Sequence, residues 1–158
     1  MSSVGRTGLM AKVPVKIRRA KPEDLHAIYD MGRDEEGFAV SSFTKFYGEN
    51  YLRNWIKEPR DDILLVADSD GEISGFVLCR VIRGSTAILD NIGVKYSKRN
   101  RGIGGLLLEE CMRLLKRAGI GYVAAIVRSG HRSLGFFKSH GFRTGNEFTW
   151  IERDLREG

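Results

Sequence analysis

A short basic run rich in glycine has the composition of a phosphate-binding loop. The run from Arg99 to Gly105 reads RNRGIGG and lies between an apolar stretch ending near Val94 and an amphipathic stretch beginning at Leu106. That order predicts a strand, a tight turn and a helix. Glycines let backbone N–H groups approach a ligand, and a helix N-terminus adds unpaired donors and a positive dipole end. The run therefore predicts a phosphorylated ligand.

Two common phosphate-binding patterns do not describe this loop. The string GxxxxGK[ST] of nucleotide-binding loops is absent from the chain. The dinucleotide fingerprint GxGxxG also fails, because Gly102, Gly104 and Gly105 have a different spacing. That fingerprint also belongs to an early strand–helix–strand unit, whereas this loop follows the fourth expected strand of the chain.

Hydrophobic periodicity predicts the elements that must position the loop. The expected strands are residues 13–19, 63–67, 73–82, 86–96, 122–127 and 147–155, and the expected helices are residues 21–32, about 42–58, 106–118 and 133–140. Short turns make the second, third and fourth strands antiparallel, while a helical crossover makes the fourth and fifth parallel. The uninterrupted apolar strand 122–127 is expected to be buried on both faces. The fold class is α/β with a mixed sheet, in the order β-α-α-β-β-β-α-β-α-β.

Composition indicates one globular domain over residues 13–158, preceded by a disordered segment 1–12. The chain has 158 residues and a net charge of +6, which favours an anionic partner. Nucleic acid is not expected, since neither an aromatic-basic RNP pattern nor a helix-turn-helix signal is present. Cys79 and Cys111 lie in apolar runs, so we expect buried thiols, a cytoplasmic setting and no metal. No apolar run is long enough to span a membrane, and residues 1–12 do not form a signal peptide.

Several motifs together resemble the GCN5-related N-acetyltransferases (GNATs). Arg99-x-x-Gly102-x-Gly104 resembles the family signature [QR]-x-x-G-x-[GA]. The stretch 89–94 is similar to the family's fourth strand, and 138–142 (KSHGF) is similar to its downstream Gly-Phe segment. The expected order of elements also matches over residues 14–155. The resemblance implies a GNAT-like acyl-CoA N-acyltransferase fold.

The resemblance implies acetyl-CoA as the acetyl donor. Backbone N–H groups of residues 100–105 are then expected to hold the pyrophosphate, while the pantetheine arm pairs along the fourth strand. The side chains of Arg99 and Arg101 either reach the phosphates or are solvated surface charges. The cofactor-binding residues implied in this way are Ile92, Gly93, Val94, Arg99, Asn100, Arg101, Gly102, Ile103, Gly104, Gly105, Ser133 and Phe137.

The implied reaction is direct attack of a primary amine on the thioester in a ternary complex. A lysine amine costs about 4–5 kcal/mol to neutralise at pH 7, and an α-amine only about 1 kcal/mol. A base therefore matters much more for lysine. Asp90, or a water held by Asn91, is the candidate, and strand alternation places the two on opposite faces. The alternative for Asp90 is a salt bridge, and Glu35 and Glu36 are second candidates.

The chain departs from the family where a general acid is expected. Many GNATs place a tyrosine four residues before the Gly of Gly-Phe, and Phe137 stands there. Protonating the departing thiolate saves only about 2 kcal/mol, so catalysis remains compatible with this loss. His131 or Ser133 are substitutes, although His131 also fits an exposed position at a helix start. The backbone N–H of Gly93 or Val94 is the candidate for stabilising the oxyanion.

The acceptor is expected between the first two helices. Glu36, Phe38, Phe43 and Tyr47 are the candidate substrate-binding residues, and the alternative for the aromatic ones is core packing. The sequence leaves the acceptor open among a protein N-terminus, a lysine and a small amine. A non-catalytic acyl-CoA-binding regulatory module is the alternative function, favoured by Phe137. A homodimer is compatible with the sequence.

Overall fold

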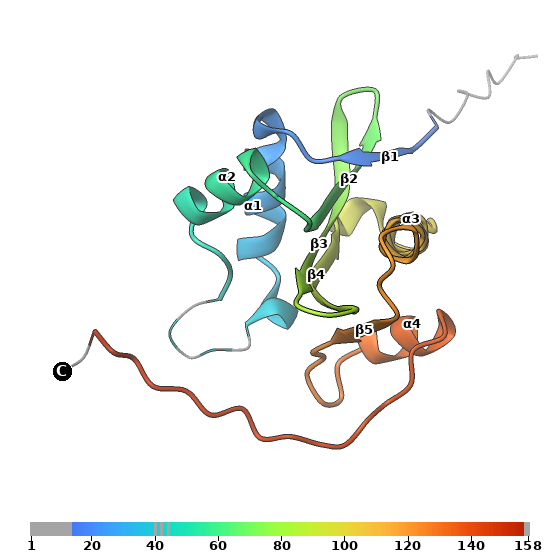
Figure 1. Ribbon diagram of the computed structural model, residues 1–158. Coiled ribbons are helices and arrows are strands. Elements are labelled where there is room, and N and C mark those ends of the chain that lie inside the picture. Colours follow the sequence, from blue (N-terminus) through green and yellow to red (C-terminus); the bar gives the residue numbers. More distant parts are fainter. Residues whose placement is uncertain (1–13, 40, 42, 44, 157–158) are drawn as a thin grey trace, which may run out of the picture.

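A five-stranded mixed sheet organises the computed structural model, which describes residues 14–39, 41, 43 and 45–156 (Figure 1). The strands lie in chain order, and they are β1 (Lys16–Arg19), β2 (Ile63–Ser69), β3 (Glu72–Ile82), β4 (Thr86–Val94) and β5 (Tyr122–Ala125). The first four pair antiparallel, and β4 pairs parallel with β5. The predicted antiparallel series β2, β3 and β4 and the predicted parallel pairing of β4 with β5 are confirmed. The prediction of disorder for residues 1–12 lies outside the described residues.

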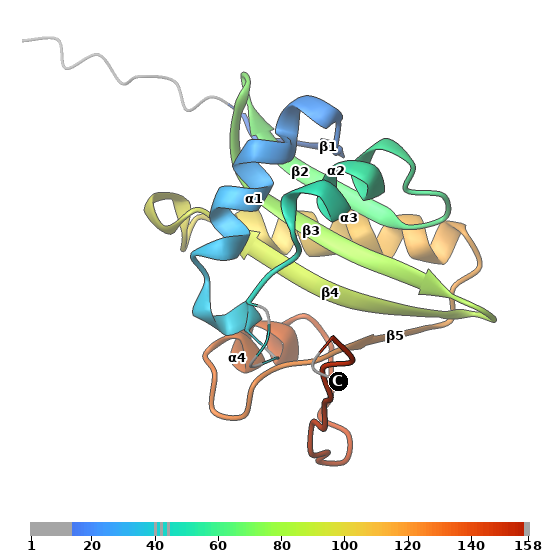
Figure 2. The same ribbon diagram turned by 90° about the vertical axis from the view of Figure 1, so that its left-hand side faces the viewer.

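Helices cover both faces of this sheet (Figures 1 and 2). The α-helices are α1 (Leu25–Arg33), α2 (Glu49–Lys57), α3 (Ile103–Arg117) and α4 (Ser133–Ser139), and the short 3-10 helices are η1 (Pro22–Asp24), η2 (Glu36–Phe38) and η3 (Tyr96–Lys98). No helix in the described part of the chain is long and apolar enough to cross a membrane.

Two apolar cores lie on opposite sides of the sheet. One joins α1 and α2 to β2 and β3, through residues such as Ile28, Leu52 and Phe76. The other joins α3 to the opposite face, through residues such as Leu107 and Val77. The segment between α1 and α2 therefore lies on one face of the sheet, beside β4. The glycine loop before α3 follows the C-terminal end of β4.

Both ends of α3 use glycine in the left-handed region. Gly102 precedes the helix with φ 80°, and Gly119 follows it with φ 81°. The N–H of Gly119 donates to Lys116 O and that of Ile120 to Leu115 O, the Schellman pattern that satisfies the last carbonyls. This ending turns the chain directly into β5, beside β4.

The strands β4 and β5 separate after a short paired stretch. Their register runs from Thr86 opposite Tyr122 to Leu89 opposite Ala125, and β5 ends there while β4 continues to Val94. The remainder of β4 therefore lacks its β5 neighbour, so backbone groups along this edge, apart from Val94 O, which accepts from Arg99 Nε, can pair with a ligand.

Three predicted elements differ from the structure. The second helix begins at Glu49 rather than near residue 42, a residue outside the described set. The strand 122–127 ends at residue 125 and is not buried on both faces, since Tyr122 and Ile126 are 63% and 60% exposed. The cause is that β5 is an edge strand of the described sheet and leaves β4.

The last predicted strand, residues 147–155, is not formed. Its alternation of Phe148 and Trp150 with polar residues is typical of a half-buried strand. Both side chains are instead exposed, at 88% and 55%, and the described residues there carry no strand. An alternating segment forms a strand only where it can hydrogen-bond to the edge of a sheet. Whether such an edge lies beside the segment depends on the tertiary structure.

A β-bulge in β4 overturns the predicted faces of two site residues. Leu78 of β3 lies opposite Asn91, whereas the next residue, Cys79, lies opposite Leu89. Asp90 is therefore an extra residue, and alternation does not separate it from Asn91. Asn91 pairs with a residue of the α1–α2 core, and the carboxylate of Asp90 interacts with Tyr47 of the α1–α2 segment. Both face that segment.

Candidate active site

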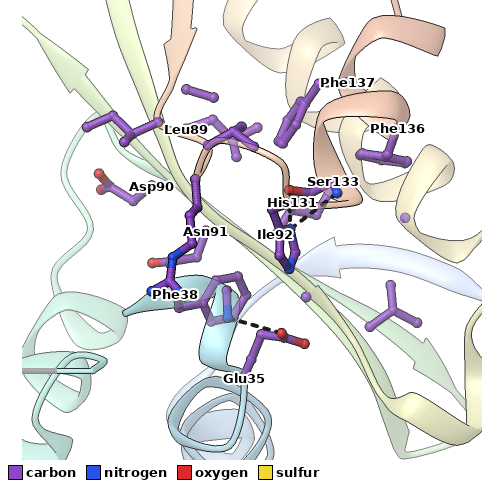
Figure 3. A pocket seen from close by; sticks show the side chains of 18 of the residues that line it. Glu35, Phe38, Leu89, Asp90, Asn91, Ile92, His131, Ser133, Phe136 and Phe137 are labelled. Atoms are coloured by element: carbon purple, nitrogen blue, oxygen red, sulfur yellow. Dashed lines mark hydrogen bonds between the residues drawn. The ribbon is translucent and has the colours of Figure 1, made fainter. Parts of the chain in front are cut away.

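One cavity joins the glycine loop, the separated strands and the α1–α2 segment. Its volume is about 890 Å³, near the upper end for small-molecule sites. The glycine loop and start of α3 line one end, the unpaired part of β4 and residues 125–128 line the middle, and η2 with the following aromatic residues closes the other side. Figure 3 shows this convergence, with Asp90 and Asn91 on one side and His131 and Ser133 on the other.

The glycine loop has the backbone conformation of an anion cradle. Asn100 and Gly102 have φ 59° and 80°, and Gly102 immediately precedes α3. Gly104 lies in the first turn of the helix, where N–H groups have no intrahelical partner. A methyl group built on Gly104 would lie 3.3 Å from the Phe136 ring, so any side chain there would enter the space between α3 and α4. The loop residues present fit a pyrophosphate.

The side chain of Arg99 contacts protein groups rather than the open cradle. Its Nε donates to Val94 O at 2.9 Å, and its Nη2 pairs with Glu35 Oε2 at 2.5 Å. The guanidinium also lies over the Tyr96 ring, 5.4 Å from the centroid. Arg99 thus connects the loop after β4 with the segment after α1, and its direct reach to phosphate stays a prediction.

Glu35 is held in its charged form by these neighbours. Burial raises the pKa of its carboxyl, but the Gly37 N–H and the Arg99 guanidinium outweigh burial, so the pKa lies below its ordinary value. A depressed carboxyl pKa stabilises the fold above the unfolded-state value, and that stabilisation is lost as the pH falls through the folded-state value.

Glu35→Gln is therefore expected to lower the free energy of unfolding by about 1 kcal/mol at pH 7 and by much less near about pH 3. Urea denaturation of wild type and variant at both pH values measures the difference. Glu36→Gln is the matched control, because Glu36 is an exposed neighbour outside the cavity lining. An equal deficit for Glu35→Gln at both pH values would show that the Arg99 ion pair is not its source.

Asp90 forms a two-point ion pair with Arg80 of β3. Its Oδ2 accepts from Arg80 Nε at 2.5 Å and its Oδ1 from Arg80 Nη2 at 2.7 Å. The Asp90 side chain is 9% exposed. Burial and the Asp90 carboxylate raise the pKa of the nearby Tyr47 hydroxyl. This is the salt-bridge alternative from the sequence, and the geometry does not support Asp90 as a free base.

Aromatic side chains line the cavity on the side of the α1–α2 segment and also pack the core there. Phe38 packs against Phe46 and Phe76, and Phe46 packs against Tyr47. Arg128, which follows β5, donates from Nη2 to Ala39 O at 2.5 Å and so links the far wall to the α1–α2 segment. The same rings pack the core and line the cavity, so core packing is confirmed for them and substrate binding stays a prediction.

At the start of α4, His131 and Ser133 contact each other inside the cavity. Nδ1 of His131 lies 2.7 Å from Ser133 Oγ and accepts from the Ser133 N–H at 3.2 Å. Phe137 lies one turn later, is 6% exposed and packs edge-on against Phe136 and Phe142. The phenyl ring thus lines the cavity without a hydroxyl.

The cavity lining agrees with most of the site residues expected from the sequence. Those that line it are Asp90, Asn91, Ile92, Gly93, Val94, Arg99, Asn100, Gly102, Ile103, Gly104, Gly105, Ser133, Phe137, Phe38 and Tyr47. Arg101, Glu36 and Phe43 do not line it; all three are exposed, and Phe43 is 46% exposed.

Sequence reasoning missed several basic residues of the lining. They are Lys45, Arg80, Lys98, Arg128 and Arg132. Arg80 could have been found, because a β3–β4 hairpin brings it near Asp90 on the neighbouring strand. Arg128 and Arg132 follow β5 in a loop, where no periodicity signals which side chains turn inward.

The profile of the "Acetyltransferase (GNAT) family" matches residues 25–142. A histidine N-acetyltransferase of Xenopus tropicalis is 34% identical over an alignment of 102 positions, and the match covers 60% of this chain and 31% of that protein. The chain thus spans about a third of the length of this curated relative.

Solved structures share the fold. A ribosomal-protein-alanine N-acetyltransferase of Brucella melitensis has a TM-score of 0.70 at 25% identity, covering 81% of this chain and 84% of that chain. A PaiA N-acetyltransferase of Thermoplasma acidophilum, solved in complex with coenzyme A, has a TM-score of 0.66 at 23% identity, covering 85% and 93%.

Proposed function

Since the chain belongs to the acetyltransferase (GNAT) family, we propose that it transfers the acetyl group of acetyl-CoA to an α-amino group of an amino acid or of a peptide N-terminus. The observation that carries the proposal is one continuous cavity that joins a pyrophosphate-type cradle to a proposed acceptor side. The coenzyme A complex of the Thermoplasma relative supports the choice of donor.

The ion pairing of the carboxylates that line the cavity favours an α-amine over a lysine amine as the acceptor. Among the described residues, Glu35 and Asp90 are the acidic side chains that line the cavity. Each is tied to an arginine, Arg99 and Arg80 respectively. Without a free carboxylate base, an acceptor that is easily neutral at pH 7 has a large advantage, and an α-amine costs about 1 kcal/mol against 4–5 for lysine. The similarity to a histidine N-acetyltransferase and to a ribosomal-protein-alanine N-acetyltransferase supports this choice.

In the proposed reaction the α-amine attacks the thioester directly in a ternary complex. The free backbone of β4 beyond Leu89 pairs with the pantetheine arm, and the N–H of Gly93 or Val94 is proposed to stabilise the oxyanion. Asn91, which is 9% exposed in the cavity lining, is proposed to hold a water near the amine.

A thiol-release assay tests the proposal. Purified protein and acetyl-CoA are mixed with a lysine-containing peptide whose N-terminus is either free or blocked, and with free amino acids. We expect the peptide with a free N-terminus to react about 300-fold faster at pH 7 than the blocked one, following the difference in the fraction of neutral amine. Comparable rates for the two peptides would refute α-amine selectivity.

The non-catalytic alternative is favoured by Phe137, which supplies no hydroxyl to the cavity. It predicts that acetyl-CoA binds and that no amine in the panel causes thiol release above the rate without amine. Calorimetric titration of acetyl-CoA, run beside the assay, separates this outcome from a chain that does not bind the donor.

A further inference from the structure

His131 stands between the two walls of the cavity. On one side its Nδ1 contacts Ser133 Oγ at 2.7 Å, at the start of α4. On the other side, a methyl group built on Gly37 would lie 2.9 Å from its Nε2 and 3.3 Å from Glu35 Oε1. The two ring nitrogens therefore face different elements, α4 for Nδ1 and the segment after α1 for Nε2. Figure 3 shows His131 and Ser133 beside Ile92, with Glu35 across from them.

Ser133 places a hydroxyl on the face of α4 that carries Phe137. The two residues are four apart, so they lie one above the other on the same side of the helix. Both line the cavity. Phe137 has no hydroxyl to protonate a leaving sulfur, and Ser133 supplies one a single turn earlier.

We propose that His131 and Ser133 form a proton relay from the acceptor amine to the sulfur of coenzyme A. The proposal rests on the function proposed above. The amine nitrogen forms a bond to the acetyl carbon, the carbon–sulfur bond breaks, and its electron pair goes to sulfur. Nε2 of His131 takes the proton that nitrogen loses, Nδ1 gives its proton to Ser133 Oγ, and the Ser133 O–H proton goes to sulfur.

The relay leaves the imidazole proton on Nε2, and exchange with water restores it to Nδ1. The observed contacts match the state after transfer, because Nδ1 accepts from the Ser133 N–H. Histidine suits this task because its two nitrogens exchange donor and acceptor roles. The opposing interpretation is that His131 only caps the first free N–H of α4, which predicts a stability effect without a chemical one.

Kinetics separate the two interpretations. Ser133→Ala is expected to lower kcat about 30-fold, a larger effect than its effect on the Kd of acetyl-CoA, since thiolate protonation is worth that factor near neutral pH. His131→Gln is expected to lower kcat at least as much. Ser139→Ala is the matched control on α4, because Ser139 bonds to Phe136 O and lies outside the cavity lining.

Two further measurements keep the test sharp. The deficit of Ser133→Ala should shrink when the donor is the acetyl thioester of an acidic aryl thiol, whose thiolate leaves without a proton. Adding Phe137→Tyr to Ser133→Ala should restore kcat, because it returns a hydroxyl to the same face. Unchanged kcat in Ser133→Ala, or a loss that is the same for both donors, overturns the relay.

A spectroscopic readout does not depend on the acceptor. In protein labelled with ¹⁵N-histidine, coenzyme A should shift the Nδ1 signal of His131, and desulfo-coenzyme A should bind without that shift. Ser133→Ala should abolish the difference between the two ligands. Equal shifts from both ligands overturn the relay even if the enzyme is active. A sulfur-dependent shift in a protein that acetylates no amine overturns the proposed function, and with it the catalytic role of the relay.

Discussion

Replacing Gly104 with aspartate is expected to weaken acetyl-CoA binding by about 100- to 1,000-fold while the fold is retained. Gly104 lines the cavity in the first turn of α3, and a side chain there enters the space beside Phe136. A carboxylate would occupy the place proposed for the pyrophosphate, and juxtaposed like charges cost several kcal/mol. The helix itself is not weakened, since an acidic residue in the first turn favours the helix dipole.

Gly104→Asn is the matched control, because asparagine has almost the same size without the charge. Calorimetric titration with acetyl-CoA is expected to show a smaller loss for asparagine, and thermal unfolding should show both variants folded. Equal losses for the two variants would indicate steric exclusion alone. Unchanged affinity in both would place the pyrophosphate elsewhere.

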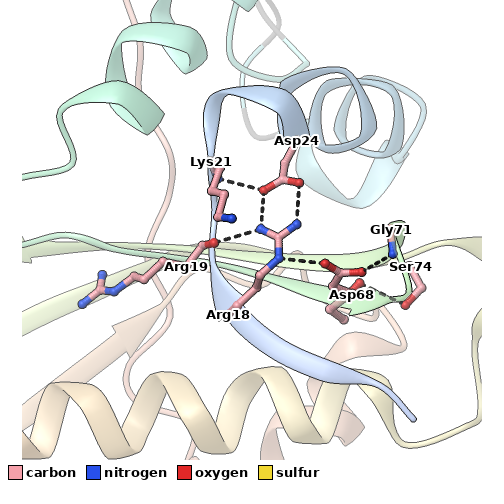
Figure 4. A network of polar contacts seen from close by, with 8 residues as sticks. Arg18, Arg19, Lys21, Asp24, Asp68, Gly71 and Ser74 are labelled. Atoms are coloured by element: carbon pink, nitrogen blue, oxygen red, sulfur yellow. Dashed lines mark hydrogen bonds and ion pairs between the residues drawn. The ribbon is translucent and has the colours of Figure 1, made fainter. Parts of the chain in front are cut away.

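Replacing Asp24 with asparagine is expected to lower the free energy of unfolding by about 3 kcal/mol. Asp24 is 3% exposed and accepts two hydrogen bonds from Arg18, at 2.7 and 2.9 Å, and one from the Lys21 N–H at 2.8 Å (Figure 4). Arg18 also donates to Asp68 at the end of β2, 2.8 Å away. Removing one charge leaves the part-buried guanidinium incompletely paired where α1 joins the sheet.

The matched control is Asp30→Asn, which removes the charge of an aspartate in α1, the helix that follows Asp24. Asp30 and its partner Arg33 are 60% and 54% exposed, so this pair is expected to contribute less than about 0.5 kcal/mol. Urea denaturation at pH 7 compares the two variants. A loss for Asp24→Asn no larger than that for Asp30→Asn would mean that the Arg18 network does not hold α1 on the sheet.

Local pattern sufficed for most of the fold. Alternation and short turns predicted β2, β3 and β4 as an antiparallel series, and the helical period of residues 106–118 predicted α3 as the crossover to a parallel β5. Pattern failed for residues 147–155, because a strand also requires a free edge in the right place. It failed as well for the burial of Tyr122, which depends on where β5 leaves β4.

The site shows the same division. Residues of the glycine loop could be predicted, because the cradle is made by backbone conformation and a helix start within one short segment. The faces of Asp90 and Asn91 could not, because one inserted residue in β4 reverses the alternation that the prediction used. That Glu35 is ion-paired rather than a free base could not be predicted either, because its partner Arg99 lies 64 positions away in the sequence.

The sequence by itself determined the family, the order of the elements from β1 to α4 and the position of the glycine loop before α3, because these follow from short-range spacing and helix-start chemistry. The tertiary structure alone decided which charged groups are free. It ties Asp90 to Arg80 and Glu35 to Arg99, and it brings His131 between α4 and the segment after α1. These contacts depend on the bulge in β4, on the loop after α1 and on the separation of β4 from β5. A local sequence pattern does not predict any of these features.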